Sequence, residues 1–447
     1  MNRIAVSIFG LGWVGLCTAV SLVQKGIDTI CVDIDKRKIE MIQEGKPPFF
    51  EPGLETALIE ISSSKNFRLT TNTVWALKRS SISFITVGTP SKPEGGIDLR
   101  FVEAVSRDIG RALKTKSNYH LVVVKSTVVP GTTENLVKPI LMQQSHKRCG
   151  PDFGLCLNPE FLKEGSAMHD TLNPDRIIIG EYDNRSGSTL ENFYQKFHGE
   201  EIPPVLRTNL TNAELIKYAG NAFLAVKISF INTIANICEK IPGADVATIA
   251  QGMGLDKRIS HLFLRAGLGY GGSCLPKDLK ALILYSKEKG YKPKLLESIE
   301  QANDIQPLRA IEIAERLLGT VRDKWIAILG LAFKPDTDDM REAVSIKIIN
   351  KLLQKGAEVS VYDPVAIGNA EKIFGEKINY ANSREECLKK TDCCIIVTEW
   401  DEFKSLTPEE LERNMRTPIL IDGRRIIDPS TFQDKVKYAA IGLGVER

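Results

Sequence analysis

The run GGSCLPKD at residues 271–278 has the residue types that covalent catalysis requires. Proline suits the first turn of a helix, so the chain is predicted to turn at the glycine pair and to present Cys274 at a helix N-terminus. The helix dipole favours a thiolate there, and Asp278, four residues on, lies on the same helical face. The alternative is a glycine-rich turn leading a half-buried cysteine into a helix.

A second group of reactive side chains follows the apolar, strand-like run 154–157. Glu160 and Glu164 are four residues apart, so they share a face if this turn is helical. Two carboxylates held close together disfavour joint ionisation, and one with a raised pKa would serve as a general base. The alternative is an exposed acidic first turn of a helix, where the dipole favours negative charge.

Lys217 and Asn221 are also four residues apart, within the longest helical pattern of the chain, about residues 212–240. Most positions around them are apolar, so this helix is predicted to connect two α/β halves and to offer a surface for a dimer. The alternative for Lys217 and Asn221 is an exposed polar stripe.

The N-terminal residues have the pattern of a dinucleotide-binding unit. A strand-like run at 4–9 leads into GLGWVG at 10–15, then a helical stretch at 16–25, a second strand at 29–32 and Asp33. Gly10 permits the tight turn, Gly12 admits a pyrophosphate and Gly15 allows close packing of helix on strand. Asp33 suits the ribose hydroxyls and would repel the extra phosphate of NADP, so NAD is the predicted cofactor. The alternative is a glycine turn without a ligand.

Two further strands end in polar loops. The run 83–87 leads into Gly88, Thr89, Pro90 and Ser91, and 120–125 leads into Ser126 and Thr127. Loops at the carboxyl ends of parallel strands line the ligand crevice of an open sheet, so Thr89, Ser126 and Thr127 are placed to touch cofactor or substrate. The alternative is that Thr127 caps the following helix.

The same order of elements restarts near residue 324. Strands are predicted at 325–329, 358–362, 394–398 and 419–421, with a helix at 345–354. Only the first glycine of the fingerprint remains, at Gly330, so a second complete dinucleotide site is not expected. Lys334, Arg341 and Arg424 lie in strand-end loops, and bases suit a polyphosphate ligand. Ordinary surface cations are the alternative.

Composition bounds the class of protein. A chain of 447 residues is too long to fold around one hydrophobic core. Its composition, with 43% hydrophobic residues, 26% charged residues and a net charge of +3, gives no reason to expect binding to nucleic acid or membrane. The N-terminus enters a strand-like run without a signal-like segment. The nine cysteines and five histidines form no metal-binding spacing, so no metal site is expected and a reducing cytoplasm fits best.

Taken together, the motifs resemble those of the UDP-glucose/GDP-mannose dehydrogenase family. They are GLGWVG at 10–15, EPGLE at 51–55, VGTPS at 87–91, KSTVVPGT at 125–132, NPEFLKEGSA at 158–167, the helix of Lys217 and Asn221, the cysteine run and GLAFKPDTDDMRE at 330–342. They cover almost the whole chain in the family's order. Within the family the chain is most similar to the branch that oxidises UDP-glucose.

The resemblance implies a four-electron oxidation of a sugar C6 hydroxymethyl with two NAD, through a thiohemiacetal and a thioester on Cys274. It makes Lys217 and Asn221 the oxyanion site, Glu160 the base of thioester hydrolysis, and Asp278 and Thr127 organisers of water and proton transfer. The implied cofactor residues are Gly10, Leu11, Gly12, Trp13, Val14, Gly15, Asp33, Lys38, Val87, Gly88, Thr89, Pro90, Ser126, Thr127, Glu164 and Arg341.

The implied substrate residues include Arg258, whose counterpart can reach across from a neighbouring subunit in this family. The others are Glu160, Phe161, Leu162, Lys163, Glu164, Lys217, Asn221, Phe263, Arg265, Tyr270, Gly271, Phe333, Lys334 and Arg424. Ser273 argues against the UDP-N-acetyl-hexosamine branch, which usually has histidine there. SCLPKD is equally similar to GDP-mannose dehydrogenases, so GDP-mannose remains an alternative substrate.

The expected fold is α/β, with two Rossmann-like doubly wound parallel-sheet domains joined by the long central helix. Residues 1–205 are expected to bind NAD, 206–305 to form the connector and dimer region with the catalytic cysteine, and 306–447 to bind the nucleotide sugar. Two other functions remain open. A two-electron dehydrogenase would not need Cys274, and a non-catalytic NAD or nucleotide-sugar sensor would not need the set of Cys274, Lys217, Asn221 and Asp278.

Overall fold

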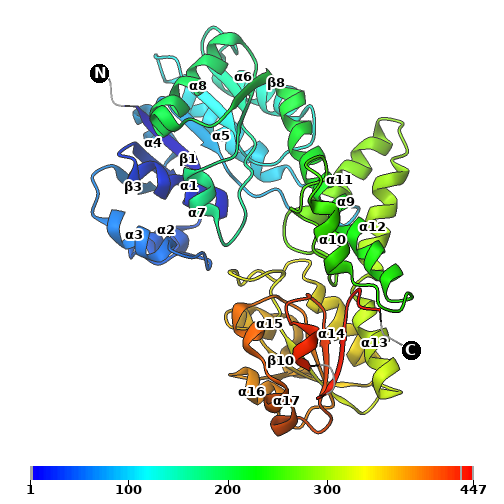
Figure 1. Ribbon diagram of the computed structural model, residues 1–447. Coiled ribbons are helices and arrows are strands. Elements are labelled where there is room, and N and C mark those ends of the chain that lie inside the picture. Colours follow the sequence, from blue (N-terminus) through cyan, green and yellow to red (C-terminus); the bar gives the residue numbers. More distant parts are fainter. Residues whose placement is uncertain (1–3, 433–434, 445–447) are drawn as a thin grey trace. The chain divides into compact units, whose positions relative to one another are not determined.

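The computed structural model describes residues 4–432 and 435–444 and divides between Gly220 and Asn221 into two compact units (Figure 1). Each unit is an α/β layer structure built on one sheet. The boundary lies inside the long helix α9 (Leu210–Cys238), so one continuous helix contributes residues to both units.

The sheet of the first unit has the strand order β3-β2-β1-β4-β5-β6-β7-β8. All neighbours are parallel except β6 and β7, which are antiparallel. Its first six strands follow the order of a doubly wound sheet. In such a sheet the order in which strands are added reverses between β1 and β4, and a crevice opens at that point. The strands are β1 (Ala5–Phe9), β2 (Asp28–Val32), β3 (Phe67–Thr70), β4 (Ile82–Ile85), β5 (Leu121–Val124), β6 (Gly154–Leu157), β7 (Ile177–Glu181) and β8 (Val205–Asn209).

Helices cover both faces of this sheet because its buried strands are apolar on both sides. On β1, Val6 and Ile8 join a core with α1, α3 and α8, whereas Phe9 joins a separate core with α4, α5 and α6. The helices are α1 (Trp13–Gln24), α2 (Lys36–Gln43), α3 (Leu54–Ser62), α4 (Thr73–Arg79), α5 (Arg100–Lys114), the π-helix η1 (Thr133–Val137), α6 (Lys138–Ser145), α7 (Ala167–Leu172), α8 (Asn184–His198) and the 3₁₀-helix η2 (Gly199–Glu201).

The second unit begins with helices and continues into a six-stranded sheet of order β11-β10-β9-β12-β13-β14, parallel throughout. Its helices before the sheet are α10 (Val246–Gly254), α11 (Leu275–Glu288), α12 (Lys294–Ile305) and α13 (Leu308–Leu318). The strands are β9 (Trp325–Leu329), β10 (Glu358–Tyr362), β11 (Asn379–Tyr380), β12 (Cys393–Ile396), β13 (Ile419–Asp422) and β14 (Lys437–Ala440). The helices around them are α14 (Val344–Gln354), α15 (Ile367–Phe374), η3 (Gly375–Lys377), α16 (Arg384–Leu388), η4 (Asp401–Ser405), α17 (Pro408–Asn414) and α18 (Pro429–Phe432).

The second unit repeats the contact between a glycine turn and the aspartate that follows the neighbouring strand. Asp363, after β10, accepts hydrogen bonds from Leu331 N at 2.7 Å and Ala332 N at 3.1 Å, and from the Trp400 indole at 3.1 Å. It is almost fully buried, so the carboxylate at the position equivalent to Asp33 closes its own turn.

Among the described residues, helix α9 alone is long and apolar enough to cross a membrane, judged by length and composition only. Buried core helices have the same property. Helix α9 begins two residues before the predicted start and ends two residues before the predicted end. Lys217 and Asn221 are both buried in it, which excludes the interpretation as an exposed polar stripe.

Candidate active site

Cys274 is the N-cap residue of α11, with Pro276 in the first turn of that helix. Among the described residues, Cys274 is the one exposed cysteine, and the eight other cysteines are buried. The Ser273 hydroxyl lies 3.6 Å from its sulfur. The predicted placement of a thiol at a helix N-terminus is therefore correct, and the interpretation as a half-buried structural cysteine is not.

The turn before Cys274 depends on glycine because backbone passes close by. Gly272 has a φ of +84°, and a Cβ there would lie 2.7 Å from the Phe333 ring. A Cβ on Gly271 would collide with the Glu342 carbonyl oxygen. Gly272 N also donates to Arg341 O at 3.0 Å, so the cysteine turn is pinned to the loop that follows β9.

Asn221 and Asp278 form a buried pair in the second unit. Asn221 Nδ2 donates to Asp278 Oδ2 at 2.6 Å, and Lys277 Nζ lies 2.5 Å from Asp278 Oδ1. Asp278 is 1% exposed, and a carboxylate at this depth is tolerated only when its oxygens are hydrogen-bonded or paired. The amide of Asn221 is thereby held in one orientation.

Lys217 and Glu160 form a buried ion pair in the first unit. Lys217 Nζ lies 3.0 Å from Glu160 Oε1, and Leu162 N donates to Glu160 Oε2 at 2.6 Å. Burial alone would raise the pKa of Glu160, but the Lys217 ammonium, the Leu162 amide and the charge of Lys125 hold it below its usual value. Glu160 is therefore a carboxylate that stays ionised.

The expected pair of Glu160 and Glu164 needs correction. Residues 158–163 are irregular and no helix forms until α7, so the two glutamates do not share a helical face. Glu160 is paired with a lysine instead, and its pKa is lowered rather than raised. The reason is the long-range contact with α9, which local spacing could not reveal.

The loop around Glu160 is held by a residue that sequence reasoning missed. The buried Glu51 carboxylate accepts from Gly165 N at 2.8 Å and from Ala167 N at 2.7 Å. These bonds tie the segment 160–167 to the EPGLE motif and cap the start of α7. Within that segment, two cations lie near the Phe161 ring, with the Arg176 guanidinium 3.9 Å and Lys217 Nζ 5.3 Å from its centroid.

The neighbouring side chains of that loop differ in exposure. Leu162 and Glu164 are half-buried. Lys163 is exposed and pairs with Asp170, whose carboxylate also accepts from Lys163 N at 3.0 Å.

The glycine-rich turn has the shape that a pyrophosphate requires. Gly10 has a φ of +100°, and a Cβ on Gly15 would collide with the Gly10 carbonyl. The space beside Gly12 is open to 4 Å, and no side chain caps the N-terminus of α1. Free amide groups at a helix N-terminus bind anions, so the residues present fit NAD. The Trp13 ring stacks on Phe49 with centroids 4.1 Å apart.

Asp33 is fixed by the same turn. Its carboxylate accepts from Leu11 N at 2.8 Å and Asp35 N at 3.0 Å, and Lys38 Nζ lies 3.1 Å away. Burial would raise the pKa of Asp33, but these donors lower it below its usual value. A carboxylate at this position accepts hydrogen bonds from ribose hydroxyls and repels an added phosphate.

The loops after β4 and β5 are bonded to each other. Thr89 Oγ1 donates to Thr127 O at 2.8 Å, and Ser126 Oγ donates to Val87 O at 2.7 Å. Thr127 is not the N-cap of the following helix, because that position belongs to Thr132. Gly88 has open space beside it and Pro90 lies in the same loop, so the predicted loop residues are brought together at the carboxyl edge of the sheet.

Several predicted substrate residues of the second unit surround the cysteine turn. Tyr270 is held by two hydrogen bonds with Asn303, at 2.9 Å and 3.0 Å. Arg424 donates to Gly269 O at 2.9 Å and to Val397 O at 2.6 Å, so it joins this turn to the loop after β12. Arg424 is thus a largely buried brace, rather than the free loop cation that its position suggested.

The remaining predicted residues are on the surface of the second unit. Arg258 and Arg341 are exposed, and each forms a bidentate pair with the aspartate two residues before it, Asp256 or Asp339. Phe263, Arg265 and Lys334 also reach solvent, and Phe263 has a φ of +64°. No pattern in the sequence marked Asn303, whereas Glu51 belongs to the EPGLE motif and Lys125 to the KSTVVPGT motif.

Comparison with known proteins identifies the family. Its models match in order: the NAD binding domain at residues 4–198, the central domain at 211–305 and the UDP binding domain at 327–429. Two relatives are the UDP-glucose 6-dehydrogenase TuaD of Bacillus subtilis, 41% identical over 97% of this chain and 91% of the relative, and AglM of Haloferax volcanii, 42% identical over 94% and 97%.

A solved structure matches as well. The UDP-glucose dehydrogenase from the archaeon Pyrobaculum islandicum superimposes with a TM-score of 0.91 and 36% identity, covering 99% of this chain and 98% of that one. The expected NAD domain and UDP-binding domain are therefore present. The chain belongs to the UDP-glucose/GDP-mannose dehydrogenase family.

Proposed function

We propose that this protein is an NAD-dependent UDP-glucose 6-dehydrogenase that converts the C6 hydroxymethyl of UDP-glucose to the carboxylate of UDP-glucuronate. Relatives of that activity align over nearly the whole chain. The observation that carries the proposal is Cys274, exposed at the N-cap of α11, in the unit that also holds the buried pair of Asn221 and Asp278. A two-electron dehydrogenase or a sensor would have no use for this arrangement.

Each residue of the proposed site has a separate role in the reaction. The Cys274 sulfur adds to the C6 aldehyde and holds it as a thiohemiacetal, whose oxidation leaves a thioester. Lys217 and Asn221 stabilise negative charge on the C6 oxygen. Glu160 accepts a proton from the water that cleaves the thioester, while Asp278 and Thr127 orient water and move protons. When bound, NAD supplies the hydride acceptor for each oxidation.

We assign the cofactor to the glycine turn, Asp33, Lys38 and the loops of Thr89 and Thr127, with Glu164 and Arg341 as further contacts. The nucleotide sugar is assigned to the segment 160–164 and to Arg258, Phe263, Arg265, Tyr270, Gly271, Phe333, Lys334 and Arg424. In this division residues 1–205 bind NAD, 206–305 carry the nucleophile and the dimer surface, and 306–447 bind the nucleotide. A cytoplasmic location is part of the proposal.

A homodimer through α9 is also proposed. Leu215, Phe223, Phe230 and Ile237 are spaced by eight, seven and seven residues, which keeps them on one side of the helix, and each is at least 42% exposed. An apolar stripe of this kind is typical of a helix that packs against another. Light scattering should give a dimer mass for the wild type and a smaller mass for Phe223→Asp with Phe230→Asp. Phe101→Asp, at an exposed position on α5, is the matched control.

The activity is tested by stoichiometry. Limiting UDP-glucose with excess NAD should yield two NADH per sugar, because both oxidations occur before release. One NADH per sugar would exclude the four-electron mechanism. A parallel panel with GDP-mannose and UDP-N-acetyl sugars tests the substrate, and faster oxidation of GDP-mannose would replace UDP-glucose in the proposal.

A further inference from the structure

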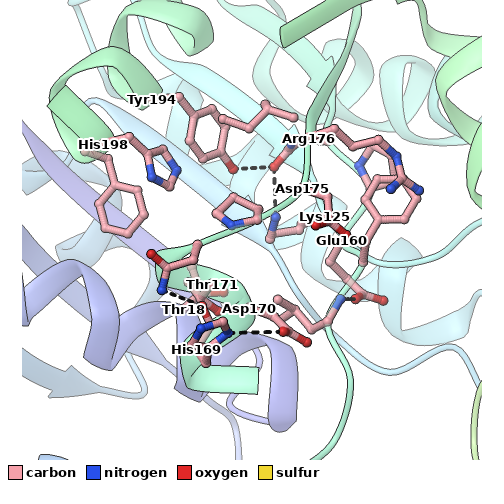
Figure 2. A pocket seen from close by; sticks show the side chains of 18 of the residues that line it. Thr18, Lys125, Glu160, His169, Asp170, Thr171, Asp175, Arg176, Tyr194 and His198 are labelled. Carbon is pink, nitrogen blue, oxygen red and sulfur yellow. Dashed lines mark hydrogen bonds and ion pairs between the residues drawn. The ribbon is translucent and has the colours of Figure 1, made fainter. Parts of the chain in front are cut away.

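The buried polar network that reaches the cysteine turn lies in the second unit. The first unit has a cavity of about 280 Å³, between the segment 158–177 and the helices α1 and α8 (Figure 2). All of its lining belongs to the first unit, whereas Cys274 belongs to the second. In the second unit, hydrogen bonds surround the loop 330–333 after β9, and this loop contacts the cysteine turn directly.

Side chains from three separate segments hold the backbone of this loop. Asp363 Oδ2 accepts from Leu331 N at 2.7 Å and from Ala332 N at 3.1 Å. The Ser345 hydroxyl donates to Leu331 O at 2.5 Å, and the Thr398 hydroxyl donates to Ala332 O at 2.6 Å. All five residues are buried, and 331 and 332 belong to neither a helix nor a strand. Side chains therefore replace the partners that regular structure gives to buried backbone groups.

The Asp363 carboxylate is itself fixed in place. Its Oδ1 accepts from Val365 N at 3.0 Å and from Ala366 N at 2.9 Å. The Trp400 indole donates to Oδ2 at 3.1 Å. Trp400 comes two residues after Thr398, so the segment that follows β12 holds the loop after β9 at two points, directly and through Asp363.

Phe333 connects the loop to the cysteine turn. A Cβ on Gly272 would lie 2.7 Å from the Phe333 ring, so the ring and the backbone of the turn are in close contact. Phe333 N donates to Asp339 O at 3.1 Å, and Gly272 N donates to Arg341 O at 3.0 Å. Because Cys274 is two residues after Gly272, a shift of the loop would also shift the nucleophile.

We propose that Thr398 and Trp400 are positioning residues, which hold the loop 330–333 in the shape that binds the nucleotide and supports Cys274. The inference rests on the proposed function, which assigns the nucleotide sugar to the end of this loop. A loop that is already fixed spends no binding free energy on becoming ordered. Loss of these contacts should therefore weaken nucleotide binding and misplace the thiol. NAD binding should change little, because the glycine turn and Asp33 lie in the first unit.

The first test is Thr398→Val, which removes the hydroxyl and keeps the size of the side chain. The Kd of UDP, measured by isothermal titration, and the KM of UDP-glucose should each rise by about tenfold, because the buried Ala332 carbonyl loses its donor. The Kd of NAD should stay within twofold of the wild type. In the same variant kcat should fall by about tenfold, within the loss that a misplaced reacting group causes. Thr398→Ser keeps the hydroxyl and should restore UDP affinity.

The matched control lies before the same strand. Thr391 is fully buried, and its hydroxyl donates to Leu388 O at 2.7 Å, two residues before β12 begins, whereas Thr398 comes two residues after β12 ends. Thr391→Val thus removes the same kind of hydrogen bond away from the loop 330–333, and its UDP affinity should stay within twofold of the wild type. An equal loss of UDP affinity in both valine variants would indicate general destabilisation and overturn the proposal.

A second variant decides the question if Thr398→Val does not fold. Trp400→Phe removes the indole N–H that Asp363 accepts, and it should raise the Kd of UDP by about threefold, the effect of one modest hydrogen bond. UDP affinity within twofold of the wild type in the folded variants would refute the positioning role. Failure of the proposed function is distinct, since the wild type would then form fewer than two NADH per sugar, whereas the comparison of UDP affinities needs no turnover.

Discussion

Asn221 Nδ2 lies 2.6 Å from Asp278 Oδ2, and this contact joins α9 to the first turn of the helix that Cys274 caps. One turn earlier on α9, Lys217 forms its own pair with Glu160 in the first unit. A single helix therefore carries the two polar side chains assigned to the oxyanion site. Each is held by a carboxylate from elsewhere in its own unit.

Asn221→Asp should be more destabilising than Asn221→Leu at pH 7. The aspartate places a second carboxylate against buried Asp278, whereas leucine removes only the hydrogen bond. The difference in unfolding free energy should be on the order of 1–3 kcal/mol. Urea unfolding at pH 7 measures it, and an equal loss for both variants would contradict the pairing.

Cys274→Ala should abolish turnover and leave NAD affinity unchanged, because the thiol is needed for the covalent steps and not for the cofactor. Isothermal titration with NAD and an NADH assay measure the two properties. In the folded wild type, iodoacetamide should modify Cys274 before the eight buried cysteines. Peptide mapping checks this order, and normal turnover of the alanine variant would refute the covalent role.

Glu51→Gln should lower kcat by about tenfold, corresponding to about 1.4 kcal/mol, because an amide offers one acceptor oxygen to two backbone donors. The segment that presents Glu160 would lose one of its two anchors. Glu55→Gln, at an exposed position on α3, is the control and should retain wild-type kinetics. Recovery of kcat in Glu51→Asp relative to Glu51→Ala would separate the hydrogen bonds from mere bulk.

His120 should contribute to acid unfolding. Burial lowers its pKa to about 3, while the unfolded value is about 6.5, so between these values the unfolded chain binds a proton that the folded chain does not. The stability that neutral, buried His120 contributes is fully present above pH 6.5 and is lost as the pH falls toward 3. The slope of unfolding free energy between pH 6 and 4 should drop by about 1.4 kcal/mol per pH unit in His120→Gln. His261→Gln, at an exposed position, is the control.

Local patterns predicted the elements that carry the chemistry. The strand, GLGWVG turn and helix at the N-terminus were correct because glycine spacing and β-branched runs are constraints on adjacent residues. The position of Cys274 at the start of α11 was predicted for the same reason, from a glycine pair and a proline. The antiparallel pairing of β6 with β7 was not anticipated, since strand runs do not indicate direction.

The sequence by itself determined the family motifs, the two α/β units and the helix that bears Lys217 and Asn221. Only the tertiary structure decided their partners. Lys217 meets Glu160 and Asn221 meets Asp278, each across 57 residues, and Glu51 meets Gly165 across 114. Periodicity says which face of a helix is buried but not which group it meets. Burial then decides the chemistry. A buried carboxylate beside an ammonium stays charged, whereas a buried carboxylate beside a second carboxylate takes up a proton.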